Sequence, residues 1–247
     1  DFAEAARDIT WRAAPAGERR NVDTGYAIYH SACFGYSLTG DPDFLPLVRM
    51  GAESLSHLYH PEMGMLMFSL PDQKHTEFAL QRCVRPMEIL IDTGEVLDLL
   101  WWAGALDAKF RSMAERTVEK MVQAGLIRED GATYQCVEID PETLQPVGCF
   151  TRQGYSDESV WARGQAWAMI FLATAYELTG RDEYLGLGTA CSDWFIDHLP
   201  DDLVPFYDFS DPRIPQIARD SSAAAIAAVA LSAISRHSQQ LRDRYRP

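Results

Sequence analysis

The chain has 247 residues, of which 47% are hydrophobic and 23% charged, and its formal net charge at pH 7 is −14. This length can bury a substantial core, and the composition is that of a soluble globular protein. The negative charge argues against nucleic acid or an anionic membrane surface as a partner, because both repel an acidic protein. A small anionic sugar bound at a locally positive point is still compatible with this charge.

The cysteines and histidines predict neither a disulfide framework nor a metal site. The five cysteines are odd in number and form no Cys-x-x-Cys pair, so reduced thiols in a cytoplasmic protein are expected. His57 and His60 are close together, but no further ligands follow them at metal-site spacing. No signal peptide is recognisable, and no apolar run is long enough to cross a bilayer. We expect no metal, cofactor, nucleic acid or membrane partner, and the oligomeric state stays open.

Apolar residues recur at helical spacing along most of the chain, which predicts an all-helical fold. Two stretches, residues 36–45 and 176–185, are similar: an apolar segment ends in Thr-Gly, and an acidic segment follows. Glycine here is typical of a helix C-terminus, so each stretch predicts one helix, a turn and a second helix. The predicted helices cover residues 2–13, 24–38, 42–58, 87–104, 107–124, 157–178, 182–198 and 221–236.

Four aspartates lie at or near the predicted starts of apolar helices. Asp23, Asp92, Asp157 and Asp220 are separated by 69, 65 and 63 residues, and a repeated two-helix unit would give such a period. Aspartate also favours helix N-termini because it caps them, which accounts for one or two of these residues. Helical hairpins in series can bury their apolar faces by closing into a ring. The aspartates would then converge at one mouth of that ring.

One segment between the helices differs from the rest. Residues 133–139 alternate apolar and polar side chains, and turn residues follow at 140–143. Residues 131–152 therefore predict a short β-hairpin inserted between helices. The proline- and aspartate-rich segments 61–81 and 200–218 predict long loops, which often surround functional sites.

Residues 153–167 are the most informative stretch of the chain. They place an amide, two carboxylates, an arginine and two tryptophans around one predicted helix start. Arg163 and Trp167 are four residues apart and share a helix face. A guanidinium beside an indole can hold an anionic sugar, since one binds the carboxylate and the other stacks on the ring. The alternative is an amphipathic helix with core tryptophans and a solvated arginine, but the whole string favours a site.

With these motifs the chain resembles the unsaturated glucuronyl hydrolases, glycoside hydrolase family 88. The matching pieces occur in family order and span nearly all of the chain. They are residues 23–26, 91–92 with 101–103, 140–143, 153–167 and 219–225. The resemblance implies one catalytic domain over residues 1–247 with the fold of an (α/α)6 toroid, incomplete at both ends, into which the β-hairpin is inserted.

The resemblance also implies a reaction, the removal of a 4,5-unsaturated uronic acid from the non-reducing end of lyase-generated oligosaccharides. A carboxylic acid protonates C4 of the vinyl ether, water activated by the same carboxylate adds at C5, and the hemiketal opens to release the aglycone. Asp92 matches the family's acid/base, and Asp23 matches its other essential aspartate. Burial or a second carboxylate would raise the pKa of Asp92. Gln153, Arg163 and Trp167 match residues that hold the uronate, and Gln135 and Trp161 are further substrate-binding candidates.

Some residues depart from the family pattern. Val22 and Gln135 stand where the family commonly has histidine, and residues 93–96, with Gly94 among them, depart from the apolar run that usually follows the family's acid/base. Glutamine can donate and accept hydrogen bonds but cannot carry a positive charge, and glycine weakens a helix interior. Four interpretations stay open: an active unsaturated uronyl hydrolase, which the retained aspartates favour, a sugar-binding toroid without turnover, an unsaturated rhamnogalacturonyl hydrolase, and a helical-repeat scaffold that binds protein.

Overall fold

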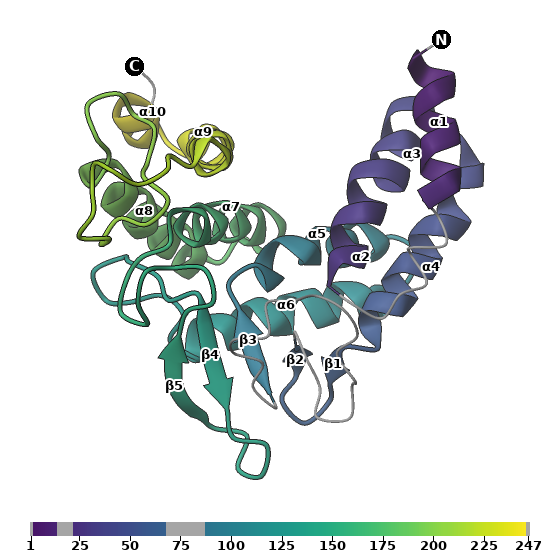
Figure 1. Ribbon diagram of the computed structural model, residues 1–247. Coiled ribbons are helices and arrows are strands. Elements are labelled where there is room, and N and C mark those ends of the chain that lie inside the picture. The colour runs from purple at the N-terminus through teal and green to yellow at the C-terminus, as the bar shows by residue number, and fades with distance from the viewer. Residues whose placement is uncertain (1, 14–21, 68–86, 246–247) are drawn as a thin grey trace. The chain divides into compact units, whose positions relative to one another are not determined.

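In the computed structural model (Figure 1), residues 2–13, 22–67 and 87–245 are described. The chain divides into two compact units. The first comprises residues 1–70 and 95–120, and the second comprises residues 71–94 and 121–247. Helices dominate both units, which confirms the predicted helical fold class.

The first unit is helical with one short hairpin. Residues 23–39 form one continuous helical segment, in which a π-helical turn separates two α-helices, as the prediction of a helix over 24–38 requires. The elements are α1 (Phe2–Ala13), α2 (Asp23–Ile28), the π-helix Tyr29–Cys33, α3 (Phe34–Thr39), the 3-10 helix Pro42–Phe44, α4 (Leu45–Ser56), the strands β1 (Tyr59–His60) and β2 (Met65–Leu66), most of α5 (Thr93–Ala103) and most of α6 (Ala108–Gln123). Strands β1 and β2 pair antiparallel, and residues 68–81 of the predicted loop lie outside the described residues.

The second unit combines three strands with the C-terminal helices. It contains β3 (Glu88–Leu90), β4 (Cys136–Ile139), β5 (Pro146–Phe150), α7 (Ala162–Thr179), α8 (Asp182–Asp197), α9 (Ser221–Ser235) and α10 (Gln239–Tyr245). The β4–β5 hairpin confirms the predicted insertion, and β3 adds to it in an antiparallel sheet of order β3-β4-β5. Helix α10 was not predicted.

The Thr-Gly pairs end helices as predicted. Gly40 follows α3 and Gly180 follows α7, and each has φ +69°, the left-handed conformation that glycine adopts without steric cost. The N–H of each glycine donates to the carbonyl four residues earlier, at 2.7 Å for Gly40 and 2.8 Å for Gly180. These bonds satisfy carbonyl groups that the helix ends would otherwise leave unpaired.

Two predicted helix starts are wrong. Residues 88–90 form β3, because their fully buried backbone pairs with β4; a short apolar run fits a strand as well as a helix. Helix α7 begins at Ala162 instead of residue 157, and Asp157 lies in the preceding loop, where its Oδ1 accepts the N–H of Thr151 at 3.0 Å. Asp157 therefore does not start a helix, whereas the other three periodic aspartates do.

Helix α7 is the core of the second unit and packs against both α8 and α9. Most of its side chains are buried, including Ala166, Ala168 and Leu172. Helix α9 offers a matching face of small residues, since Ala223, Ala227 and Ala230 are buried at helical spacing. Small side chains on both helices allow their backbones to approach closely.

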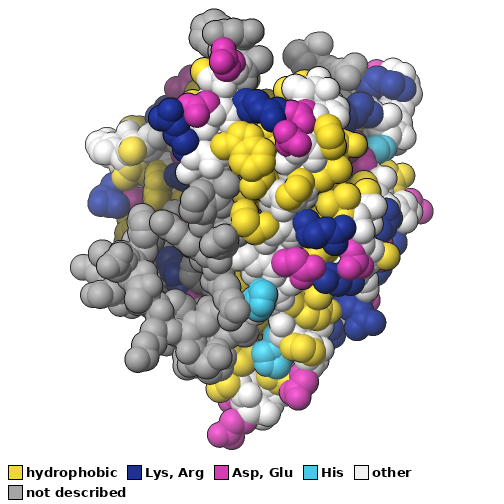
Figure 2. Space-filling model, turned by 90° about the vertical axis from the view of Figure 1, so that its right-hand side faces the viewer, with side chains coloured by type: hydrophobic (Ala, Val, Ile, Leu, Met, Phe, Trp, Pro, Cys, Tyr) yellow, Lys and Arg dark blue, Asp and Glu magenta, His cyan; other side chains and the backbone are white. Residues whose placement is uncertain are grey.

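On the surface of the first unit, charges are paired. Arg7 contacts Asp41 and Asp43, and Lys109 lies 2.7 Å from Glu53. Figure 2 shows one face of the molecule, on which basic side chains lie beside acidic ones. Exposed pairs of this kind contribute at most about 1 kcal/mol each to the free energy of unfolding.

Within the described ranges, no helix combines the length and the hydropathy that crossing a bilayer requires.

A cluster of ionisable side chains is partly buried in the first unit. His30, on the π-helical turn, has its Nε2 3.9 Å from Oε1 of Glu95 on α5. Burial, together with the nearby Glu95 carboxylate, raises the pKa of Asp98 to about 7. Burial also raises the pKa of Glu95, and the Glu95 carboxylate raises the pKa of His30. The folded cluster therefore retains protons that the unfolded chain releases.

Asp98→Asn is expected to raise the free energy of unfolding, and to raise it more at about pH 8 than at about pH 5. Because the pKa of Asp98 rises from 3.8 to about 7 on folding, the folded state binds more protons in this window, and its stability falls as pH rises through it. Asparagine removes that loss, and each kcal/mol gained raises Tm by about 2–4 °C. Thermal unfolding at both pH values measures the effect, with Glu142→Gln in the exposed β4–β5 turn as control. An effect of Asp98→Asn that does not change with pH would contradict the raised pKa.

Candidate active site

The buried amide of Gln135 holds the segment that follows β5. Gln135 precedes β4 and is 4% exposed. Its Oε1 accepts hydrogen bonds from the Thr151 hydroxyl at 2.7 Å and from the N–H groups of Arg152 and Gln153 at 2.8 and 2.9 Å. One side chain therefore satisfies two backbone donors in a segment without regular structure, as burial requires.

The same network fixes the orientation of the Gln153 side chain. Since the two backbone donors identify the oxygen of the Gln135 amide, its Nε2 is the group that faces Gln153 and donates to Gln153 Oε1. The amide nitrogen of Gln153 is thereby turned away from Gln135. Gln153 is partly exposed, so this N–H₂ group is oriented to donate to a ligand oxygen.

Gln135 also anchors the segment that carries Asp92. Its backbone carbonyl accepts the N–H of Ile91 at 2.8 Å, and Asp92 follows between β3 and α5. The Ile91 side chain lies against the first turn of α7, since a Cβ added to Gly164 would be 3.2 Å from Ile91 Cγ2. Asp92 is partly buried. Gln135 and Ile91 thus join Asp92, Gln153 and the start of α7 within the second unit.

Gly94 permits close packing of the start of α5. A Cβ added at Gly94 would lie 2.2 Å from Cδ1 of Phe171 on α7, which no real side chain allows. Gly94 is the second residue of α5. Although glycine weakens a helix interior, it is required at this position because any side chain would collide with α7. This contact lies two residues from Asp92 and helps to hold it in place.

Arg163, in the first turn of α7, is held by a buried carboxylate. Its Nε and Nη2 lie 3.1 and 3.0 Å from Oδ2 of Asp220. Asp220 is 4% exposed, and its other oxygen caps α9 by accepting from the N–H of Ala223 at 2.9 Å and from the Ser222 hydroxyl. Burial opposes ionisation, but these hydrogen bonds and the Arg163 charge outweigh it and lower the pKa of Asp220. Arg163 therefore has an ionised partner that fixes its direction.

The two tryptophans of the motif differ in exposure. Trp161 is 3% exposed, and its ring centroid lies 5.2 Å from the guanidinium carbon of Arg163, a cation–π distance. Trp167 lies one turn after Arg163 on α7 and is partly exposed. Trp161 supports Arg163 from within the unit, and Trp167 is the more exposed of the two tryptophans.

Two buried carboxylates that lie near these residues, Asp208 and Glu88, were not identified from the sequence. Asp208, 1% exposed, accepts the N–H of Tyr155 at 2.9 Å and the Ser159 hydroxyl at 2.6 Å. Glu88 on β3 forms a buried ion pair with Arg152. Both fix the loop between β5 and α7. A charged residue inside an otherwise apolar segment, as in residues 87–91, is the sequence signal that could have identified Glu88.

Asp23 lies in the first unit, whereas the six other predicted site residues lie in the second. It is the first residue of α2 and is exposed. Helix α2 packs tightly on α5, since a Cβ added to Gly25 would lie 2.5 Å from Cβ of Val96.

In the part of the chain that is described, no group of three or more histidine, cysteine, aspartate or glutamate side chains is arranged to hold a metal ion.

Gln135→Leu is expected to lower the free energy of unfolding by a few kcal/mol. The change roughly conserves volume but leaves buried donors near residues 151–153 unpaired, and each such group costs about 1–3 kcal/mol. Urea denaturation measures the loss. Gln145→Leu, in the exposed turn, is the control, and an equal loss in both variants would show that Gln135 does not organise the loop.

Known proteins with related sequences are enzymes acting on unsaturated sugars. An unsaturated chondroitin disaccharide hydrolase of Streptococcus pyogenes serotype M1 is 30% identical over 207 residues, which are 83% of this chain and 49% of that protein. An unsaturated glucuronyl hydrolase of Formosa agariphila is 29% identical over 219 residues, 86% of this chain and 52% of that protein. The chain thus spans about half the length of these relatives. No family profile matches it.

Solved structures match nearly the whole chain. The structure of the unsaturated glucuronyl hydrolase of Bacillus sp. GL1, described as responsible for the degradation of glycosaminoglycan, has a TM-score of 0.84 and 26% identity, and covers 97% of this chain and 66% of its own. An unsaturated glucuronyl hydrolase variant with dGlcA-Glc-Rha-Glc has a TM-score of 0.87 and 26% identity, with 98% of this chain and 65% of its own covered. The predicted fold class is confirmed by these matches.

Proposed function

We propose that this chain, which has the fold of the unsaturated glucuronyl hydrolases of glycoside hydrolase family 88, removes a 4,5-unsaturated uronic acid from the non-reducing end of lyase-generated oligosaccharides. The observation that carries the proposal is the linkage of Asp92, Gln153 and Arg163 within one unit through Gln135, Ile91 and α7. An acid, an amide donor and a guanidinium are the groups that protonating and holding an unsaturated uronate require.

Arg163 and Trp167 bind the uronate in this proposal. Asp220 bonds only the Nε and Nη2 groups of Arg163, and the Arg163 side chain is 32% exposed, so its remaining edge is available to the sugar carboxylate. Charge-assisted hydrogen bonds of this kind are among the stronger polar contacts. The partly exposed Trp167 ring, one turn away, offers a surface for the sugar ring, and the Gln153 N–H₂ group donates to a sugar oxygen.

Asp92 supplies the proton. Its carboxylic acid protonates C4 of the C4=C5 double bond, and the electron pair of that bond forms the new C–H bond. Positive charge then develops at C5 and the ring oxygen. Water gives a proton to the Asp92 carboxylate as it adds at C5, which restores the acid. The resulting hemiketal opens, and the aglycone leaves.

The remaining candidates take supporting or second roles. The Gln135 amide oxygen already accepts three hydrogen bonds and Trp161 is buried. We therefore assign Gln135 to positioning Gln153, and Trp161 to positioning Arg163, instead of contacting the sugar. This revises the sequence-based expectation for both residues. Asp23 is assigned the second carboxylate role on the family resemblance alone.

Two broader expectations stay predictions. We keep the assignment of residues 1–247 to one catalytic domain, because the match to the Formosa enzyme covers 86% of the chain. A cytoplasmic location is consistent with free thiols at Cys33, Cys136 and Cys191, which are all buried.

Asp92→Asn is expected to abolish activity while leaving the fold intact. The assay follows the ultraviolet absorption of the C4=C5 bond in unsaturated chondroitin- or hyaluronan-derived disaccharides, which the unmodified protein should bleach. Asparagine cannot donate the acidic proton, and general acid–base groups contribute about 10²–10⁴-fold in rate. Bleaching by the variant at the unmodified rate would remove Asp92 from the mechanism. Binding of the disaccharides by the unmodified protein without bleaching would indicate a sugar-binding protein, and absence of binding would indicate a scaffold.

Arg163→Gln is expected to weaken binding of the charged uronate more than binding of a neutral analogue. The variant keeps a hydrogen-bonding side chain but loses the charge, and a charge-assisted hydrogen bond is worth about 1.5–3 kcal/mol. Calorimetric titration of the Asp92→Asn background with an unsaturated disaccharide and with its carboxyl-reduced form measures the difference. Arg236→Gln, an exposed arginine after α9, is the control. Equal losses for both ligands would contradict this role of Arg163.

A further inference from the structure

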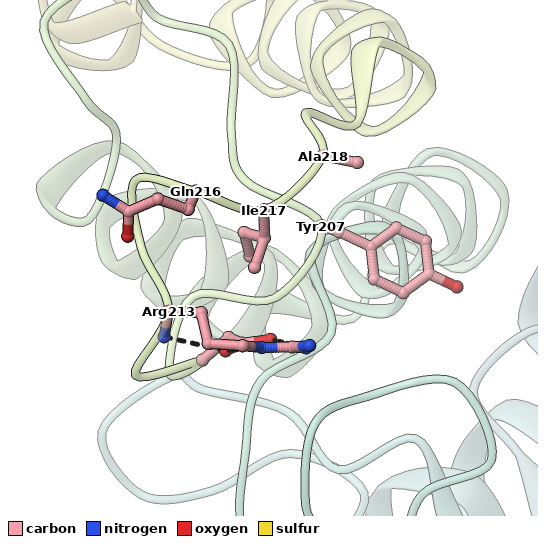
Figure 3. Close-up of a pocket in the computed structure, with 6 residues that line it drawn as sticks. Tyr207, Arg213, Gln216, Ile217 and Ala218 are labelled. Atoms are coloured by element: carbon pink, nitrogen blue, oxygen red, sulfur yellow. Dashed lines mark hydrogen bonds and ion pairs between the residues drawn. The ribbon is translucent and has the colours of Figure 1, made fainter.

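An open pocket lies in the loop that precedes α9. It has a volume of about 470 Å³ and is lined by Tyr207, Asp211, Arg213, Gln216, Ile217 and Ala218. Pockets that bind small molecules typically have volumes of this order. Figure 3 shows that Arg213, Gln216 and Ile217 come from one loop, whereas Tyr207 comes from the neighbouring segment. None of these residues has a role in the function proposed above.

The pocket is built onto the elements that carry the proposed uronate site. The Tyr207 carbonyl accepts the N–H of Ala162 at 3.1 Å, and Ala162 directly precedes Arg163. The Tyr207 N–H donates to the Ala218 carbonyl at 2.9 Å, and two residues later Asp220 holds Arg163. The wall of the pocket is therefore joined to the segments of Arg163 and Asp220 by two isolated antiparallel bridges, Trp161 with Asp208 and Phe206 with Arg219.

A second connection runs through the segment of Gln153. Tyr155, two residues after Gln153, is close enough to Arg213 to interact with it electrostatically. The N–H of Tyr155 is bound by Asp208, the residue after Tyr207. The pocket thus adjoins both the Gln153 loop and the start of α7, the two segments that carry the proposed uronate contacts.

The charges in the pocket cancel. Arg213 donates from Nε to Oδ1 of Asp211 at 2.9 Å and from Nη2 to Oδ2 at 2.6 Å, a bidentate pair. Hydrogen bonding from Arg213 lowers the pKa of Asp211, so both groups stay charged at neutral pH and together contribute no net charge. The Asp211 side chain is 5% exposed, whereas that of Arg213 is 70% exposed. A ligand therefore meets oriented N–H donors without a net positive field.

The other lining groups suit an uncharged sugar. The Tyr207 ring and the Ile217 side chain offer apolar surface to the C–H faces of a pyranose, and the Gln216 amide can donate to and accept from hydroxyl groups. A sulfate would be attracted by Arg213 but repelled by the Asp211 carboxylate, which is bonded to it. The net charge of −14 adds to that repulsion.

We infer that this pocket binds the uncharged sugar attached to the unsaturated uronate, and that the Asp211–Arg213 pair makes the site select unsulfated over sulfated aglycones. The inference rests on the proposed function and extends it, since it specifies the substrate class. Arg213 and Gln216 act as specificity-determining residues here and take no part in the proton transfer at Asp92.

Substrate preference tests this inference. The probes are the unsaturated chondroitin disaccharide without sulfate and its 6-sulfated form, and kcat/KM is measured for both. The unmodified protein should prefer the unsulfated disaccharide. Arg213→Gln should lower kcat/KM for it about threefold to tenfold, mainly through KM, because one or two hydrogen bonds are lost. Arg181→Gln, an exposed arginine that is likewise paired with an acid two residues away, should leave kcat/KM unchanged.

Asp211→Asn provides the opposite change. It leaves the Arg213 charge uncompensated, so the preference for the unsulfated disaccharide should shrink or reverse. A preference for the sulfated form in the unmodified protein, an unchanged ratio in Asp211→Asn, or equal effects of Arg213→Gln and Arg181→Gln would each overturn the inference.

A binding measurement separates this inference from the proposed activity. Calorimetric titration of the Asp92→Asn protein and its Arg213→Gln and Asp211→Asn derivatives with both disaccharides gives the same ratios without turnover. Selective binding by a protein that never bleaches the substrate would support the pocket and refute the activity. Turnover without selectivity would refute the pocket alone, and the absence of any binding would refute both.

Discussion

The arrangement of the second unit depends on the hydrogen bonds of one buried side chain and its backbone carbonyl, those of Gln135. The backbone carbonyl of Gln135 holds Ile91, its amide oxygen holds the N–H groups of residues 152 and 153, and its amide nitrogen holds the Gln153 side chain. A buried network of this kind stabilises the protein only when every member is satisfied, because each unpaired group is costly in a low-dielectric interior. The strand before Asp92 and the loop of Gln153 therefore adopt their positions together.

Two arginines of the second unit have similar carboxylate partners but differ in what they offer a ligand. Arg163 shares one oxygen of Asp220, whose other oxygen is used by the start of α9. Arg213 receives both oxygens of Asp211. The Asp220 carboxylate thus divides its oxygens between Arg163 and the first turn of α9, whereas the Asp211 carboxylate gives both of its oxygens to Arg213. In the proposed function Arg163 holds the uronate carboxylate, and in the further inference the Asp211–Arg213 pair selects against a sulfated aglycone.

The sequence predicted what depends on local pattern. Helices such as α6, α8 and α9 were located within one or two residues, since their apolar spacing and the glycines at 40 and 180 act over a few residues. The start of α7 and the strand β3 were missed because partners distant in the sequence decide them: β4 pairs with β3, and the segment at 207–209 pairs with residues 160–162. The placement of Arg163 and Trp167 on one helix was predictable from their motif. The hydrogen bonding of Gln135 was not predictable, because its partners lie 16 to 18 positions later in the chain.

The most direct test of the account is the fate of the double bond. Proton nuclear magnetic resonance of the reaction in D₂O, with an unsaturated chondroitin disaccharide and the unmodified protein, reports where a solvent hydrogen enters the product. If a carboxylic acid delivers a solvent-exchanged proton to the vinyl ether, the released uronate should carry deuterium at C4 and lack the alkene signal. Release of a uronate that retains its C4=C5 bond, or recovery of the intact disaccharide, would contradict the central claim.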